Sequence, residues 1–94
     1  MPVSFKTDIL PLFTPTDIQH MRGMGIKLSD YPYMSAAAGG KVMNCGPFPD
    51  HAHARGVYSS LTGDCKPQMP MGGPYWSPDQ LKTYQQWMDD GFLP

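Results

Sequence analysis

The sequence contains no glutamate, and charged residues make up only 16% of its 94 residues. Seven lysine and arginine residues stand against eight aspartates, which gives a formal net charge of −1. This excludes the density of positive charge that nucleic-acid binding requires, and no polybasic run predicts contact with an anionic membrane. No stretch approaches the roughly 18 apolar residues of a membrane span. We therefore expect neither nucleic acid nor a membrane as a partner.

The start of the chain has no charged segment followed by a long apolar run, which predicts no secretory signal and a cytoplasmic location. Cysteine is also scarce. Cys45 and Cys65 are separated by 20 positions and fit no CxxC redox or zinc pattern. They are expected to form a disulfide in an oxidising compartment and to remain thiols in the cytoplasm.

Glycine and proline are abundant, with 10 and 11 residues, so helices must be short and much of the backbone must turn. The length allows a single domain over residues 1–94. Strand-like alternation is scarce, whereas helix start and stop signals recur. We therefore expect an all-α fold of about four to five short helices with long ordered loops.

The start and stop signals place five helices. Thr14 precedes a proline, and Ser77 is followed by a proline and by Gln80, which is typical of a capping box. The predicted helices run from Ser4 or Thr7 to Phe13, from Thr14 to about Gly23, from Ser29–Asp30 to Gly39–Gly40, from Asp50 to Gly63, and from Ser77 to Gly91. Residues 40–50 and 64–74 are predicted to be loops, because glycines and prolines interrupt them.

Two segments near the ends of the chain carry further motifs. Residues 8–23 read DILPLFTPTDIQHMRG, and residues 68–94 read QMPMGGPYWSPDQLKTYQQWMDDGFLP. They resemble the first helix and the methionine loop with last helix of small bacterial class I cytochrome c domains. Together they cover about 43 of the 94 residues. The resemblance implies a single cytochrome-c-like helical domain.

The chain departs from that family at the haem-attachment motif. Where the family has CxxCH, this sequence reads DIQHM over residues 17–21, so both thioether cysteines and the axial histidine are missing. Covalent haem is therefore excluded. The resemblance then implies a haem-free domain whose haem crevice is filled by methionines and aromatic side chains, or is put to another use.

A soft metal site is the alternative use of that region. Thioether and imidazole ligands together favour Cu(I). The candidate ligands are His20, Met21, Met24, Met69 and Met71. A third hypothesis is non-covalent haem, with His20 and either Met69 or Met71 as axial ligands, a ligand pair known for haem iron. We favour the haem-free domain over these two alternatives, and such a domain is expected to hold no cofactor.

No catalytic constellation is recognisable, since the chain has no nucleophile–histidine–carboxylate pattern and no glycine-rich phosphate loop. Aromatic residues in turns, together with arginine, are instead typical of protein interfaces. The candidate partner-binding residues are Tyr33, Arg55, Tyr75 and Trp76. The sequence thus predicts a non-catalytic accessory or protein-binding module, acting beside a redox enzyme, with a copper-binding or electron-transfer protein as the alternative.

Overall fold

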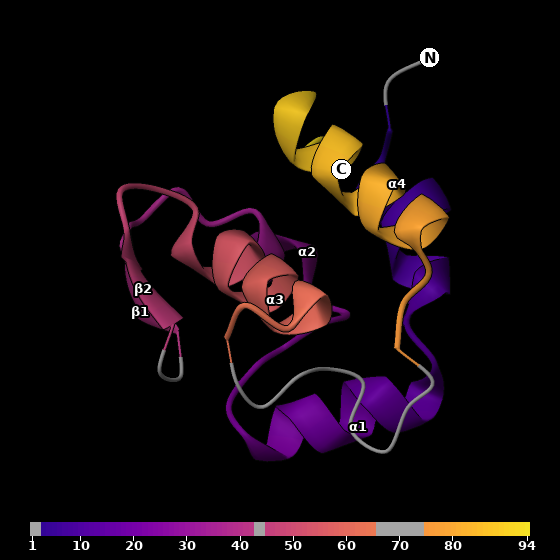
Figure 1. Cartoon of the computed structure of the whole chain (residues 1–94), viewed down its shortest axis with the longest axis horizontal. Coiled ribbons are helices and arrows are strands. Elements are labelled where there is room, and N and C mark those ends of the chain that lie inside the picture. The colour runs from indigo at the N-terminus through magenta and orange to yellow at the C-terminus, as the bar shows by residue number, and fades with distance from the viewer. Residues whose placement is uncertain (1–2, 43–44, 66–74) are drawn as a thin grey trace.

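The computed structural model describes residues 3–42, 45–65 and 75–94. In chain order its elements are a π-helical turn η1 (Phe5–Ile9), a 3₁₀ turn η2 (Leu10–Leu12), α1 (Pro15–Gly23), α2 (Tyr31–Met34), β1 (Gly40–Val42), β2 (Cys45–Phe48), α3 (Ala52–Thr62) and α4 (Pro78–Asp89). Helix α3 is central. The β1–β2 hairpin packs on one side of α3, and α4 packs on α3 and η1 (Figure 1).

Side-chain caps set where the two best-predicted helices begin. Thr14 accepts a hydrogen bond from the backbone N–H of Asp17 at 3.1 Å, and the Asp17 carboxylate accepts from the backbone of Thr14 at 3.2 Å. Ser77 and Gln80 form the same reciprocal pair at the start of α4. Both capping boxes satisfy amides that a helix leaves unpaired in its first turn. The predicted starts of these helices are confirmed.

The first and third predicted helices differ from expectation. Ser4 does cap the first turn, through the backbone N–H of Thr7. The segment that follows divides into a π-helical and a 3₁₀ turn, with Pro11 inside the latter. Helix α2 ends at Met34 instead of Gly39–Gly40. It makes one turn only, with Ser35 as its C-cap.

The prediction of an all-α fold is wrong. Residues 40–48, expected to be a loop, contain two antiparallel strands in which Gly40 pairs with Phe48 and Val42 with Cys45. The fold is therefore a small mixed α/β structure. Short strands rich in glycine and proline have no alternating pattern of their own, so tertiary contacts decide their conformation.

Those tertiary contacts come mainly from α3. Gly56 lies so close to β1 that a Cβ atom there would stand 2.6 Å from the Cβ atom of Val42. Both residues are buried. The absence of a side chain on α3 at this point lets the hairpin lie directly on the helix backbone.

A disulfide fixes the same hairpin covalently. Cys45, at the start of β2, is bonded to Cys65, which follows α3, with the two Cα atoms 5.7 Å apart. The sequence left open whether these cysteines are thiols or form a disulfide, and in the structure they form the disulfide.

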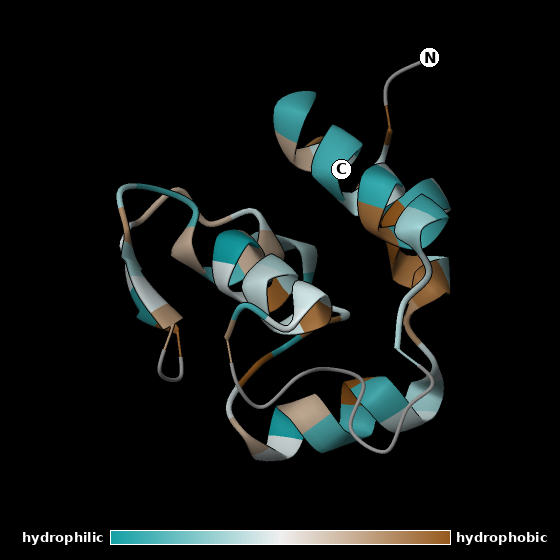
Figure 2. Cartoon of the chain, in the orientation of Figure 1, coloured by the Kyte–Doolittle hydropathy of each residue, from teal (hydrophilic) through white to brown (hydrophobic). Residues whose placement is uncertain are grey.

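The core is dominated by aromatic residues of α4. Trp87 and Tyr84 are fully buried, and the Trp87 ring contacts the rings of Phe5, Tyr84 and Phe92 at centroid distances of 5.6, 5.4 and 5.2 Å. Apolar residues therefore join α4 to η1 and to the C-terminal tail. In Figure 2 both α4 and α1 are coloured mostly as hydrophilic, with a few hydrophobic residues in each.

The first described residues pack against the last ones. The backbone N–H of Phe5 donates to the carbonyl of Leu93 at 2.9 Å, and the backbone N–H of Val3 donates to the Asp90 carboxylate at 2.9 Å. This second bond, with one from Gln86, lowers the pKa of Asp90 below its ordinary value. None of the helices in the described part of the chain is both long enough and apolar enough to cross a membrane.

Candidate functional site

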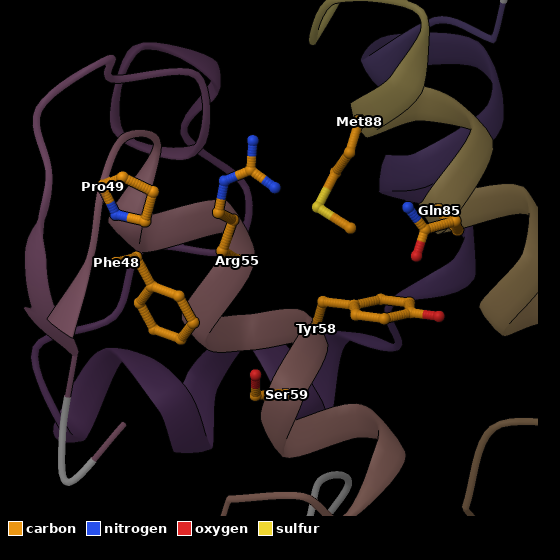
Figure 3. Close-up of a pocket in the computed structure, with 7 residues that line it drawn as sticks. All are labelled: Phe48, Pro49, Arg55, Tyr58, Ser59, Gln85 and Met88. Atoms are coloured by element: carbon orange, nitrogen blue, oxygen red, sulfur yellow. The ribbon is translucent and has the colours of Figure 1, made fainter. Parts of the chain in front are cut away.

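A groove lies where α3, α4 and the end of β2 meet. It has a volume of about 310 Å³, and Figure 3 shows side chains from all three elements directed around it. We call it the α3–α4 groove. Its lining residues are Phe48, Pro49, Arg55, Tyr58, Ser59, Gln85 and Met88.

Buried contacts hold the two helices of the groove together. The Tyr84 hydroxyl on α4 donates to the carbonyl of Ala54 on α3 at 2.8 Å. Burial raises the pKa of Tyr84 well above its ordinary value of 10, so the hydroxyl remains a donor. The Tyr58 ring also packs on that of Tyr84 with centroids 5.5 Å apart. The walls of the groove are therefore held by contacts within the core.

Arg55 is held in place by Asp50. Its Nε and Nη2 atoms both donate to Asp50 Oδ1, at 3.1 and 2.8 Å, and Nε also donates to the Asp50 carbonyl at 3.1 Å. Both side chains are partly exposed, at 38% for Arg55 and 48% for Asp50. The sequence predicted that helix α3 begins at Asp50. The N-cap is instead His51, with φ of 45°, and the Asp50 carboxylate is used to hold the guanidinium.

His51 and Phe92 complete the surroundings of this ion pair. The His51 Nδ1 atom lies 3.0 Å from Asp50 Oδ1, and the His51 ring stacks on the Phe92 ring with centroids 3.8 Å apart. The Arg55 guanidinium carbon stands 5.8 Å from the centre of the same Phe92 ring. Hydrogen bonds from His51 and then Arg55 lower the pKa of the Asp50 carboxyl below its ordinary value of 3.8.

The lowered pKa of Asp50 predicts how stability depends on pH. The folded state binds this proton less readily than the unfolded chain, so the contribution of Asp50 is present above its ordinary pKa of 3.8 and is lost as the pH falls through the lower folded value. We expect the free energy of unfolding to fall less steeply between about pH 5 and 2 in Asp50→Asn than in the parent chain. Urea unfolding across that range measures both slopes. Equal slopes in the two chains would show that the pKa of Asp50 is not lowered in the folded state.

The α4 side of the groove contributes Gln85 and Met88. Gln85 Nε2 donates to the Asp89 carboxylate at 3.1 Å, which holds the amide group in one orientation. Among the described residues, none donates a hydrogen bond to Gln85 Oε1. Met88 is 7% exposed and contributes its thioether to the wall. The groove thus combines apolar surface with a few oriented polar groups, which is typical of binding sites.

The four predicted partner-binding residues lie in different places. Arg55 lines the α3–α4 groove. Tyr33 is half-buried and stacks on the His53 ring at 3.8 Å, whereas Tyr75 is 56% exposed. Trp76 is only 8% exposed, because its ring packs on Phe13 at 5.1 Å. Trp76 therefore belongs to the core, and the structure does not gather the four residues into one surface.

The predicted metal ligands are also separated. His20 and Met24 are exposed on α1 and at its C-terminal end, while Met21 is 2% exposed and packs into the core. Met69 and Met71 lie outside the described residues. In residues 3–42, 45–65 and 75–94, no three His, Cys, Asp or Glu side chains come together as metal ligands. Copper and haem binding stay predictions from the sequence.

Most of the groove was missed by sequence reasoning. Phe48 lies in a segment predicted to be a loop and Tyr58 and Met88 in two predicted helices, and none of them was a candidate binding residue. One signal was available, since Gln85 interrupts the apolar face of the last helix between Leu81 and Met88. A polar residue in that position marks where an apolar face approaches solvent.

Comparison with protein-family models, curated proteins and solved structures finds no match to this chain. The resemblance to cytochrome c domains therefore stays a prediction from the sequence. The geometry of the α3–α4 groove carries the functional argument.

Proposed function

We propose that this domain is a non-catalytic accessory module that binds another protein through the α3–α4 groove. The observation that carries the proposal is the composition of that groove, in which aromatic, methionine and arginine side chains surround one hollow. These residue types are enriched in protein interfaces, and tyrosine and arginine often dominate the affinity. Helices and a disulfide-linked hairpin supply its walls, so little ordering is needed on binding.

The titratable groups beside the groove support a binding role. Asp50 and His51 contact each other, and Asp50 also holds the Arg55 guanidinium. Their hydrogen-bonding capacity is therefore used to fix a side chain in the groove wall. A fixed arginine loses less conformational freedom when a partner binds than a mobile one does.

We also propose that the partner is a redox enzyme and that the domain works in an oxidising compartment. The resemblance of the chain ends to cytochrome c domains is what suggests a redox enzyme as the partner. The Cys45–Cys65 disulfide favours an oxidising compartment over the cytoplasmic location that the sequence predicted, because reducing conditions keep such cysteines as thiols.

Site-specific cross-linking tests the proposed function. A photoreactive p-benzoylphenylalanine at Gln85, in the groove, is expected to cross-link a defined partner in extracts of the source cells. The same group at Gln19, on the exposed face of α1, is not. Arg55→Ala should weaken binding of the identified partner about tenfold, or 1.4 kcal/mol, by titration calorimetry.

Lys82→Ala is the matched control, since Lys82 is an exposed cation of α4 outside the groove lining. It should bind the partner as the parent chain does. Equal cross-linking from Gln85 and Gln19, or unchanged affinity in Arg55→Ala, would exclude the groove as the binding site.

A further inference from the structure

On the basis of the proposed function, we infer that the α3–α4 groove takes an uncharged aromatic side chain, presented on an extended segment of the partner protein. Three features of the groove select this occupant: its size, the groups that line it and the bonds that the Arg55 guanidinium already makes.

The size of the groove fits one aromatic side chain with its adjoining backbone. An apolar protein cavity of about 150 Å³ is large enough to bind benzene. The groove, at about 310 Å³, offers roughly twice that space and is partly open to solvent. A single ring fills the inner part, and the remainder accommodates the peptide groups that flank it.

The apolar lining favours an aromatic ring over an aliphatic side chain. Phe48 and Tyr58 present ring surfaces, and aromatic pairs gain stability beyond the area they bury. The thioether of Met88 is the second component, since sulfur makes favourable contacts with aromatic rings. In Figure 3 the Met88 side chain extends toward the Arg55 guanidinium across the groove. A ring between them would contact both.

The engagement of Arg55 argues against an acidic occupant. Arginine binds carboxylates best through two parallel N–H groups, but its Nε and Nη2 atoms already donate to Asp50. The Asp50 charge also balances that of the guanidinium and would repel a second carboxylate. Asp89, bonded to Gln85 on the α4 side, adds another negative charge nearby.

A planar face of the guanidinium and its Nη1 atom remain for a partner. Arginine stacks on aromatic rings through this face. The chain itself uses the interaction, since Arg55 stands 5.8 Å from the centre of the Phe92 ring. A partner ring in the groove would make a second contact of the same kind.

Two polar atoms are placed to recognise a peptide backbone. Gln85 Oε1 is an acceptor, because its amide nitrogen is turned toward Asp89. Arg55 Nη1 is a donor, and none of the described residues accepts a hydrogen bond from it. A peptide group offers one N–H and one carbonyl, which match this acceptor and this donor. The two atoms lie on opposite walls, as expected for a segment that passes between α3 and α4.

Titration of the full, isotope-labelled chain with three probes tests the inference. The probes are N-acetylphenylalaninamide, N-acetylleucinamide and N-acetylaspartamide, the last as the α-amide with a free side-chain carboxylate. Amide correlation spectra report the binding site. We expect saturable shifts at Arg55, Tyr58 and Gln85 with the aromatic probe, at an affinity about three- to tenfold tighter than with the other two. Equal binding of all three, preference for the aspartamide, or the absence of shifts at these residues would overturn the inference.

Three variants separate the roles of charge and planarity. Arg55→Lys keeps the positive charge but removes the planar face, so aromatic-probe affinity should fall about three- to tenfold. Asp50→Asn removes the negative charge that balances the guanidinium, so binding of the aspartamide should rise. Lys82→Ala should leave all three affinities unchanged. If Arg55→Lys binds the aromatic probe as the parent chain does, stacking on Arg55 is excluded.

These results are independent of the cross-linking experiment. A partner that depends on Arg55 and is cross-linked from Gln85, with no preference for the aromatic probe, would retain the protein-binding function and reject the aromatic occupant. Selective aromatic binding without an Arg55-dependent protein partner would reject the protein-binding function and leave a small-molecule site.

Discussion

Replacing Trp87 with alanine is expected to lower the free energy of unfolding by about 3–5 kcal/mol. Trp87 is fully buried, and its ring contacts Phe5, Tyr84 and Phe92. Its indole N–H also donates to the carbonyl of Leu93 at 2.8 Å. The substitution therefore leaves a cavity where α4, η1 and the C-terminal tail meet. Urea unfolding followed by far-ultraviolet circular dichroism measures the change.

The size of this effect matters because domains of ordinary stability unfold with only about 5–15 kcal/mol. Trp87→Ala should therefore leave a substantial unfolded population at moderate temperature. Tyr75→Ala is the control, because Tyr75 is 56% exposed and its truncation should change stability by less than about 0.5 kcal/mol. Similar losses in both variants would show that Trp87 does not organise the core.

Removing the Cys45–Cys65 disulfide should have the next largest effect. The bond closes a loop with a sequence separation of 20 residues, and a loop of this length is worth about 3 kcal/mol through restriction of the unfolded chain. For a domain of this size the melting temperature should fall by about 12–24 °C. Scanning calorimetry of Cys45→Ala/Cys65→Ala against the parent chain measures the loss.

A reducing agent provides the matched control. It should lower the melting temperature of the parent chain toward that of the double variant and leave the variant itself unchanged. Protein taken from the source cells and alkylated before reduction should carry no label on either cysteine, as expected for an oxidising compartment. Labelling of both cysteines would reject that compartment, and equal melting with and without reductant would show that the bond does not stabilise the fold.

The helices that the sequence predicted best are those with local signals. Thr14 and Ser77 identify the starts of α1 and α4 because a capping side chain bonds to backbone groups three residues away. The end of α3 at Gly63 has a similar local cause, since Gly63 adopts φ of 87°. Such features depend on a few neighbouring residues, so a single sequence is sufficient to find them.

The hairpin could not be found in this way. The pairing of Gly40 with Phe48 has no alternating sequence pattern behind it, and it depends on α3 as well as on the disulfide. A close approach such as that of Gly56 to Val42 joins residues distant in the sequence. Because glycine and proline are also typical of loops, the same residues predicted the wrong class.

The candidate site was predicted only in part, for the same reason. Arg55 was identified from its type and its helical setting, and it does line the groove. Its pairing with Asp50 accompanies a left-handed conformation at His51, which no capping rule indicates. Trp76 was predicted to bind a partner because aromatic residues in turns are typical of interfaces. Aromatic residues are also typical of cores, and only the packing of its ring on Phe13 assigns Trp76 to the core.

The bonds from Phe5 to Leu93 and from Val3 to Asp90 bring the first and last described segments to one place. A short linker from Leu93 to Val3 would close at little entropic cost, and a circularly permuted domain would keep the same contacts. Insertion of the domain into an exposed loop of a host protein would likewise leave the two halves of that loop close together.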